Sequence, residues 1–166
     1  RDSGEESEAL KWTQKTRADF KGELPEAIAL FAQVRIRIAQ NDWVNAFDDI
    51  TELQKMSDLG GTRVPSGTNK NEVAFLRAFI FEQLGRYPEA IDAYLEISDG
   101  RAEYYGWRST ERLKSLALDE KSSGFINQKF GTFFNDSQQN LTPQNADLIR
   151  QSAQNALRLT NDENVR

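Results

Sequence analysis

Carboxylate side chains are the first candidates for chemistry in this chain, because its 166 residues include no histidine and no cysteine. Without an imidazole or a thiolate, acid–base catalysis would depend mainly on aspartate, glutamate, lysine or tyrosine. Two carboxylate groups have a suitable spacing on predicted helices: one contains Asp48, Asp49 and Glu52, and the other contains Asp92 and Glu96. A catalytic acid needs an apolar pocket that raises its pKa. We expect both groups to lie opposite the apolar side of their helices and to face solvent, so we predict no catalytic residue.

A glycine-containing loop is the second candidate, since phosphate-binding loops are rich in glycine. Gly60, Gly61 and Gly67 precede Lys70. In a P-loop the lysine directly follows the last glycine, and a serine or threonine comes next. Here Thr68 follows Gly67, so the motif fails and the segment is predicted to be an extended connection between helical hairpins. The usual zinc ligands are also missing, and we therefore expect neither a cofactor nor a metal ion.

The third group combines aromatic and cationic side chains within one predicted helix. Its members are Arg101, Tyr104, Tyr105, Trp107, Arg108, Arg112 and Lys114. Aromatic rings beside cations can stack on sugar rings or hold an anionic ligand. The same helix carries a stripe of small and apolar residues, namely Gly106, Thr110, Leu113 and Ala117. Helix packing with surface ion pairs is the favoured interpretation, and a ligand-binding face is the alternative.

Four phenylalanines near the C-terminal end have helical spacing: Phe125, Phe130, Phe133 and Phe134. This spacing predicts burial in a core, and an exposed patch for a partner is the alternative. The net charge of −5 disfavours nucleic acid as a partner. No apolar run approaches the roughly 18–20 residues that cross a bilayer, so we expect no membrane span.

Helical periodicity continues through almost the whole chain, and no run alternates between apolar and polar residues. The sequence therefore predicts an all-α fold. Helices are expected over 4–20, 25–39, 43–57, 71–84, 87–98, 102–118, 123–134 and 143–160. We expect one domain over 1–166, with a capping helix in 1–24, hairpins in 25–58 and 70–98, and C-terminal helices in 101–166.

An internal repeat appears when the sequence is shifted by 44 positions. Residues 41–48 then align with residues 85–92. Each copy has an aromatic residue at the turn, a small residue three positions later, and a bulky apolar residue four positions beyond that. The small residue would let two antiparallel helices approach closely.

This pattern resembles the tetratricopeptide repeat (TPR), a helical hairpin that stacks into a solenoid. The positions that carry the resemblance or the helix packing are Trp43, Ala46, Ala78, Phe81, Gly85, Tyr87, Ala90, Tyr94 and Gly106. The first copy departs from the family pattern at Arg37, where an aromatic residue is usual, and the loop at 60–70 lengthens the period. The resemblance implies antiparallel hairpins stacked as a short TPR-like α-solenoid. By analogy with the repeat, Arg35, Phe75, Phe79 and Glu82 would face its groove.

Residues 99–113 read DGRAEYYGWRSTERL and resemble a helix in the non-catalytic superhelical part of bacterial soluble lytic transglycosylases. Those enzymes cleave peptidoglycan glycan strands without water. The family's catalytic module carries Glu-Ser and later Gly-Leu-Met-Gln, whereas Met56, the single methionine, lies between Lys55 and Ser57. No catalytic glutamate can therefore be transferred to this chain.

The resemblance implies a non-catalytic scaffold whose parent protein is a murein lytic transglycosylase in the periplasm or cell envelope. The expected partners are peptidoglycan or a catalytic module of the parent chain, and the candidate ligand groove adds Tyr104, Trp107 and Arg108. The alternative is a TPR-type adaptor that binds a peptide segment of a protein partner on its concave face. Such an adaptor is compatible with a cytoplasmic location.

Overall fold

The computed structural model describes residues 3–98 and 103–139. The described helices are α1 (Ser3–Asp19), α2 (Leu24–Ala39), α3 (Trp43–Leu53), the short 3-10 helix η1 (Gly61–Arg63), α4 (Lys70–Gln83), α5 (Tyr87–Leu95), α6 (Tyr104–Leu118) and α7 (Ser123–Gln139). The described residues contain no β-strand, and Gly60 and Thr68 form an isolated bridge. The all-α prediction is confirmed for these residues. The helix expected over 143–160 lies outside them.

The chain forms two compact units, residues 1–126 and residues 127–166. The packing discussed here belongs to the first unit. The single domain expected over 1–166 stays a prediction. In the described residues, no helix is both long and apolar enough to cross a bilayer.

Two helices end earlier than expected. The sequence predicted ends at 57 and 98, whereas α3 ends at Leu53 and α5 at Leu95. In both cases the helix is followed by a backbone hydrogen bond between residues three apart, as in a 3-10 turn. Met56 N donates to Leu53 O, and Ile97 N donates to Tyr94 O. The chain then leaves the helix axis and places an apolar side chain, Leu59 or Ile97, in a core. Burial of these side chains favours the turn over another helical turn.

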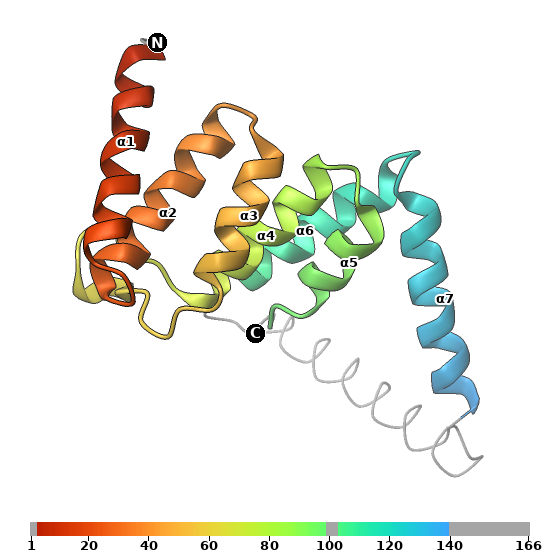
Figure 1. The fold of residues 1–166 in the computed structure, drawn as a ribbon. Coiled ribbons are helices and arrows are strands. Elements are labelled where there is room, and N and C mark those ends of the chain that lie inside the picture. Colours follow the sequence, from red (N-terminus) through yellow and green to blue (C-terminus); the bar gives the residue numbers. More distant parts are fainter. Residues whose placement is uncertain (1–2, 99–102, 140–166) are drawn as a thin grey trace, which may run out of the picture. The chain divides into compact units, whose positions relative to one another are not determined.

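Consecutive helices from α1 to α6 pack against each other, and α4 also contacts α6 (Figure 1). Two apolar clusters fill the spaces between them. The first contains Leu30, Val34, Ile50, Leu53, Val73 and Ile80 among others. The second contains Phe75, Ala78, Phe81, Ala90, Ile91, Tyr94, Leu116 and Ile126 among others. Helix α4 contributes to both clusters, so it joins the hairpin α2–α3 to the hairpin α4–α5.

The two hairpins turn in the same way at the positions that the 44-residue shift aligns. Asn41 and Gly85 both have positive φ, 59° and 71°. In each turn the next amide closes the end of the first helix, from Asp42 N to Arg37 O and from Arg86 N to Phe81 O, both at 2.9 Å. This is the 6→1 hydrogen bond of the Schellman motif, in which a right-handed helix ends at a residue with left-handed backbone conformation. The repeat found in the sequence is therefore a repeat of turn geometry.

The small residues of the repeat lie where the hairpins close. Ala46, Ala78 and Ala90 have no exposed surface, and Gly106 is buried in α6. Phe81 and Tyr94 are buried, whereas Trp43 and Tyr87 are half-buried against the two cores. A larger side chain at an alanine position would separate the helices.

The shared turn predicts opposite effects for two substitutions. Gly85→Ala should destabilise the chain by about 1 kcal/mol, because an L side chain is disfavoured at positive φ. A Cβ atom at Gly85 would meet no atom within 4 Å, so the loss would come from the backbone alone. Asn41→Gly should be neutral or slightly stabilising, because glycine adopts this conformation without strain. Urea unfolding would measure both free energies.

Gly124→Ala is the matched control, because a Cβ atom there also meets nothing within 4 Å and this glycine lies in α7 at ordinary φ. It should be neutral or stabilising, since alanine has the higher helix propensity. An equal loss of stability for Gly124→Ala and Gly85→Ala would contradict the role assigned to the turn.

Candidate functional site

The start of α6 presents two large aromatic side chains to solvent. Tyr104 is 58% exposed and Trp107 is 54% exposed, and their ring centroids lie 6.2 Å apart. Arg108 follows on the same helix and is also exposed, with its Cζ atom 5.7 Å from the Phe75 ring centroid. We call Tyr104, Trp107 and Arg108 the α6 aromatic surface. It offers flat apolar faces beside a fixed cation.

Polar contacts fix this end of α6 against α4. The Asn71 amide Nδ2 donates to Glu103 Oε2 at 2.6 Å, which ties the residue before α6 to the first turn of α4. Burial, together with a hydrogen bond to Glu72, raises the pKa of Tyr105. Thr68 Oγ1 donates to the same Glu72 carboxylate at 2.7 Å. The aromatic surface therefore sits on a helix start that several side chains hold in place.

The groove residues expected from the repeat lie in three different settings. Phe75 is buried at 7% exposure, and Phe79 is half-buried with Arg112 Cζ 5.8 Å from its ring centroid. Both pack toward α6. Arg35 is exposed and lines a hollow between α1 and α2 of about 360 Å³. The structure thus brings Phe75 and Phe79 next to α6 and leaves Arg35 at a separate hollow.

Glu82, the fourth groove candidate, joins three helices. Its side chain is 8% exposed and accepts hydrogen bonds from Tyr94 Oη at 3.0 Å and from Arg112 Nε at 3.1 Å. Arg112 Nη2 also donates to the other carboxylate oxygen. Burial and then the negative charge of Glu82 raise the pKa of Tyr94, and the hydrogen bond to Glu82 raises the pKa of Arg112. The carboxylate is fully engaged in packing α4, α5 and α6 together.

Asp49 was expected to face solvent, and this prediction is wrong. The residue is 5% exposed, and its Oδ1 accepts from Gln33 Nε2 at 3.1 Å. Arg37 Nε lies 3.1 Å from Oδ2, and Arg17 Nη1 lies 3.7 Å from Oδ1. Arg17 also reaches Glu52 Oε2 at 2.6 Å, so side chains of α1, α2 and α3 meet here. The remaining carboxylates of the two groups, Asp48, Glu52, Asp92 and Glu96, are exposed as predicted.

Burial raises the pKa of Asp49, against the opposing effects of Arg37, Arg17 and the Gln33 hydrogen bond. A raised pKa alone would suit a catalytic acid. Asp49, however, has its two oxygens directed at Arg37, Arg17 and Gln33, and we assign it to helix packing. The sequence contained two signals for this. Asp49 lies three residues after Ala46 and four before Leu53, on the apolar stripe of its helix, and Arg37 occupies the position where the second copy has the buried Phe81.

Two other packing predictions are wrong in part. In the stripe expected on α6, Gly106 is buried but Ala117 is exposed, and Ser109 and Leu116 are buried instead. Phe125 and Phe130 were expected in a core and are 42% and 40% exposed. Helical spacing shows which residues share one side of a helix. It does not show which side packs against the neighbouring helices. Arg101 and the side chains of Phe133 and Phe134 lie outside the described residues.

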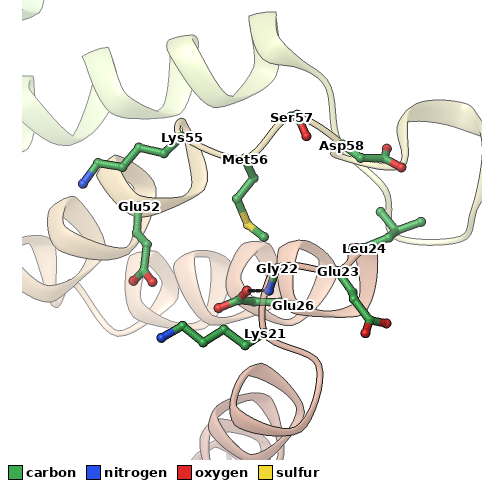
Figure 2. A pocket seen from close by; sticks show the side chains of 10 residues that line it. All are labelled: Lys21, Gly22, Glu23, Leu24, Glu26, Glu52, Lys55, Met56, Ser57 and Asp58. Atoms are coloured by element: carbon green, nitrogen blue, oxygen red, sulfur yellow. Dashed lines mark hydrogen bonds between the residues drawn. The ribbon is translucent and has the colours of Figure 1, made fainter.

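A hollow of about 350 Å³ lies between the turn after α1 and the segment after α3 (Figure 2). It is lined by Lys21, Gly22, Glu23, Leu24, Glu26, Glu52, Lys55, Met56, Ser57 and Asp58. The buried Glu26 accepts a hydrogen bond from Gly22 N at 2.6 Å, and the Met56 side chain extends toward this pair (Figure 2). Glu52 is held by Arg17. These two carboxylates thus stabilise the junction of α1, α2 and α3.

The glycine loop forms a compact turn instead of an extended connection. Gly61 N donates to Thr68 O, and Thr68 N donates to Leu59 O. A Cβ atom at Gly67 would lie 2.4 Å from Gly61 O, so this glycine permits the close approach of two backbone segments. The loop glycines therefore have a structural role.

Comparisons with protein-family models, curated proteins and solved structures gave no match for this chain. The residues and the geometry described above are therefore the basis for a functional assignment. The α6 aromatic surface is the strongest candidate site, because its side chains are exposed, close together and held on a fixed helix start.

The Asp49 network predicts a pH dependence of stability. A raised pKa means that the folded chain holds the Asp49 proton more tightly than the unfolded chain. The stability from this proton is fully present below the ordinary aspartate pKa of 3.8 and is lost as pH rises through the raised value. The free energy of unfolding of the wild type should therefore fall relative to that of Asp49→Asn across this window. Urea unfolding at a series of pH values would measure the difference.

Asp48→Asn is the control for the loss of one aspartate, since Asp48 is exposed on the same helix. Asp48→Asn removes the same negative charge from α3, so the pH dependence specific to Asp49 is read from the difference between the two variants. Identical pH dependence of Asp49→Asn and Asp48→Asn would contradict the raised pKa of Asp49.

Proposed function

We propose that this chain is a non-catalytic, TPR-like helical scaffold of a lytic transglycosylase-like protein of the cell envelope. In this proposal the hairpins α2–α3 and α4–α5, followed by α6, stack as a short solenoid. The scaffold holds a peptidoglycan glycan strand, or positions a catalytic module of the parent chain against that strand. The sequence resemblance at 99–113 is the source of the family assignment.

The repeated turn supports the TPR-like part of this proposal. Two hairpins have the same positive-φ position, each followed by the same helix-closing hydrogen bond, as expected for two copies of one repeat. Contacts between neighbouring hairpins, from α3 to α4 and from α4 to α6, also agree with stacking.

The observation that carries the glycan-binding part is the α6 aromatic surface. A sugar ring has an apolar face formed by C–H groups, and an exposed tryptophan or tyrosine ring can cover it. Tyr104 and Trp107 provide two such rings, and Arg108 beside them donates hydrogen bonds to hydroxyl or carboxylate groups. The two rings would contact adjacent parts of one extended saccharide.

Two of the buried acids, Asp49 and Glu82, favour a scaffold over an enzyme. Each is paired with arginine, so neither is an unpaired desolvated acid of the kind that catalysis uses. The adaptor alternative has less support, because Phe75 is buried and Glu82 is engaged with Tyr94 and Arg112. Both would have to leave their present contacts to bind a peptide.

Trp107→Ala tests the glycan-binding proposal. Loss of a central aromatic contact costs about 1–2 kcal/mol of binding, which corresponds to an affinity weaker by roughly tenfold. Co-sedimentation with purified peptidoglycan sacculi would measure the bound fraction at several sacculus concentrations. The wild type should bind, and Trp107→Ala and Tyr104→Ala should bind less.

Trp12→Ala is the matched control, because Trp12 on α1 is exposed to a similar degree, 61%. It should bind like the wild type. Equal weakening by Trp12→Ala and Trp107→Ala would show that sedimentation reflects general hydrophobic adhesion, and a wild type that stays in the supernatant would refute glycan binding.

A further inference from the structure

The hollow between the turn after α1 and the segment after α3 contains a buried carboxylate without a counter-charge (Figure 2). Glu26 is 8% exposed, and its Oε2 accepts a hydrogen bond from Gly22 N at 2.6 Å. Asp49 and Glu82 are both paired with arginine, whereas Glu26 forms no ion pair with a described residue. A buried charge in a protein is usually paired. Glu26 therefore has an unused capacity to bind a cationic group.

The second carboxylate oxygen of Glu26 can be reached from solvent. No described residue donates to Oε1, since the recorded hydrogen bond from Gly22 N goes to Oε2. Glu26 lines the hollow, which opens to solvent and has a volume of about 350 Å³, enough for a small molecule. One free oxygen suits an ammonium group, which is a compact point charge. A guanidinium would use both oxygens of the carboxylate.

Lysine side chains place positive charge at the same hollow. Lys21 and Lys55 line it, are exposed and form no ion pair with a described residue. Figure 2 shows both ammonium groups on the side where Glu52 lies, and Glu52 is already paired with Arg17. The amide that donates to Glu26 belongs to the peptide bond after Lys21, so the backbone of Lys21 lies next to the buried carboxylate. Opposite charges thus line one hollow without an ion pair between them.

The hollow is also close to neutral as a whole. Its charged lining residues are the carboxylates Glu23, Glu26, Glu52 and Asp58 and the lysines Lys21 and Lys55. Arg17 pairs with Glu52, and Arg63 pairs with Asp58. Two carboxylates and two ammonium groups then remain without an ion pair. A ligand that carries one charge of each sign suits this balance better than a net cation or a net anion.

We propose that this hollow binds a small zwitterion, an α-amino acid with an apolar side chain. The ligand ammonium donates to Glu26 Oε1, and the ligand carboxylate accepts from Lys21 or Lys55. The two charges of an α-amino acid are close together, and the flexible Lys21 side chain begins beside Glu26. The apolar side chain packs on Leu24 and on Met56, which extends toward Glu26 (Figure 2). This site is separate from the α6 aromatic surface and goes beyond glycan binding.

Methionine-methyl nuclear magnetic resonance of the full chain tests the proposal, because Met56 is the single methionine and lines the hollow. The probes are L-leucine, N-acetyl-L-leucine, which lacks the ammonium group, and L-leucinamide, which lacks the carboxylate. Titration to about 50 mM at constant ionic strength covers millimolar complexes and those tenfold weaker. Leucine should shift the Met56 signal saturably. The other two compounds should each bind about tenfold more weakly, because one charge-assisted contact is missing.

Variants then assign the two charges. Glu26→Gln keeps an acceptor for Gly22 N but removes the charge, so it should weaken leucine and leucinamide by about tenfold and leave N-acetyl-leucine unchanged. The double variant Lys21→Gln/Lys55→Gln should weaken leucine and N-acetyl-leucine and leave leucinamide unchanged. Glu96→Gln is the control, because Glu96 is an exposed carboxylate at the end of α5; it should change each affinity by less than about twofold.

The three probes test the wild type, so the result does not depend on the folding of a variant. The absence of a saturable Met56 shift with leucine would overturn the proposal. Equal affinity for all three probes would show apolar adhesion without recognition of charge, and tighter binding of leucinamide than of leucine would refute a zwitterion. Equal weakening by Glu96→Gln and Glu26→Gln would also refute the site. None of these results depends on sacculus binding, so the glycan-binding proposal and this one can fail separately.

Discussion

The structure depends on the burial of α4 on two sides. Val73 and Ile80 enter one apolar cluster, whereas Phe75, Ala78 and Phe81 enter the other. A helix that is apolar on two sides leaves little surface for polar groups. Its charged residues beyond the first residue, Glu72, Arg77 and Glu82, therefore all lie at contacts with neighbouring helices. Glu72 meets Tyr105 of α6, Glu82 meets Tyr94 and Arg112, and Arg77 lies over the rings of Phe47 and Phe81. The central position of α4 explains why these charges contact neighbouring helices.

The sequence predicted the elements well, because local signals determine them. Pro25 and Pro88 lie in the first turns of α2 and α5, and the aromatic residues Trp43 and Tyr87 begin α3 and α5. The 44-residue repeat reappears as a repeated turn, because positive φ at Asn41 and Gly85 depends on the residues of the turn itself. The helix ends were less predictable, since α3 and α5 stop where Leu59 and Ile97 enter the cores.

The candidate site was predictable only in part, because exposure depends on which side of a helix has a neighbour. Tyr104, Trp107 and Arg108 were identified from their residue types, and the structure leaves them at the surface. Phe75 and Glu82 have the spacing of groove residues, but α6 covers that side of α4. Asp49 escaped prediction because it was grouped with its exposed acidic neighbours, although its spacing from Ala46 and Leu53 places it on the apolar stripe of α3. Arg37 was the informative departure: a charged residue at a position that is aromatic and buried in the second copy requires a counter-charge nearby.

The carboxylates of Asp49 and Glu82 have equivalent roles at different places in the chain. Asp49 connects α1, α2 and α3 through Arg17, Gln33 and Arg37. Glu82 connects α4, α5 and α6 through Tyr94 and Arg112. A buried ion pair adds little net stability, because the cost of removing both charges from water offsets their attraction. A mismatched neighbour, however, would leave a charge buried without a partner at a cost of several kcal/mol. Apolar hairpin surfaces of similar shape can pack against each other in more than one arrangement. An arrangement that does not place the arginine partner beside Asp49 or Glu82 would leave that carboxylate buried and unpaired, and would therefore be less stable.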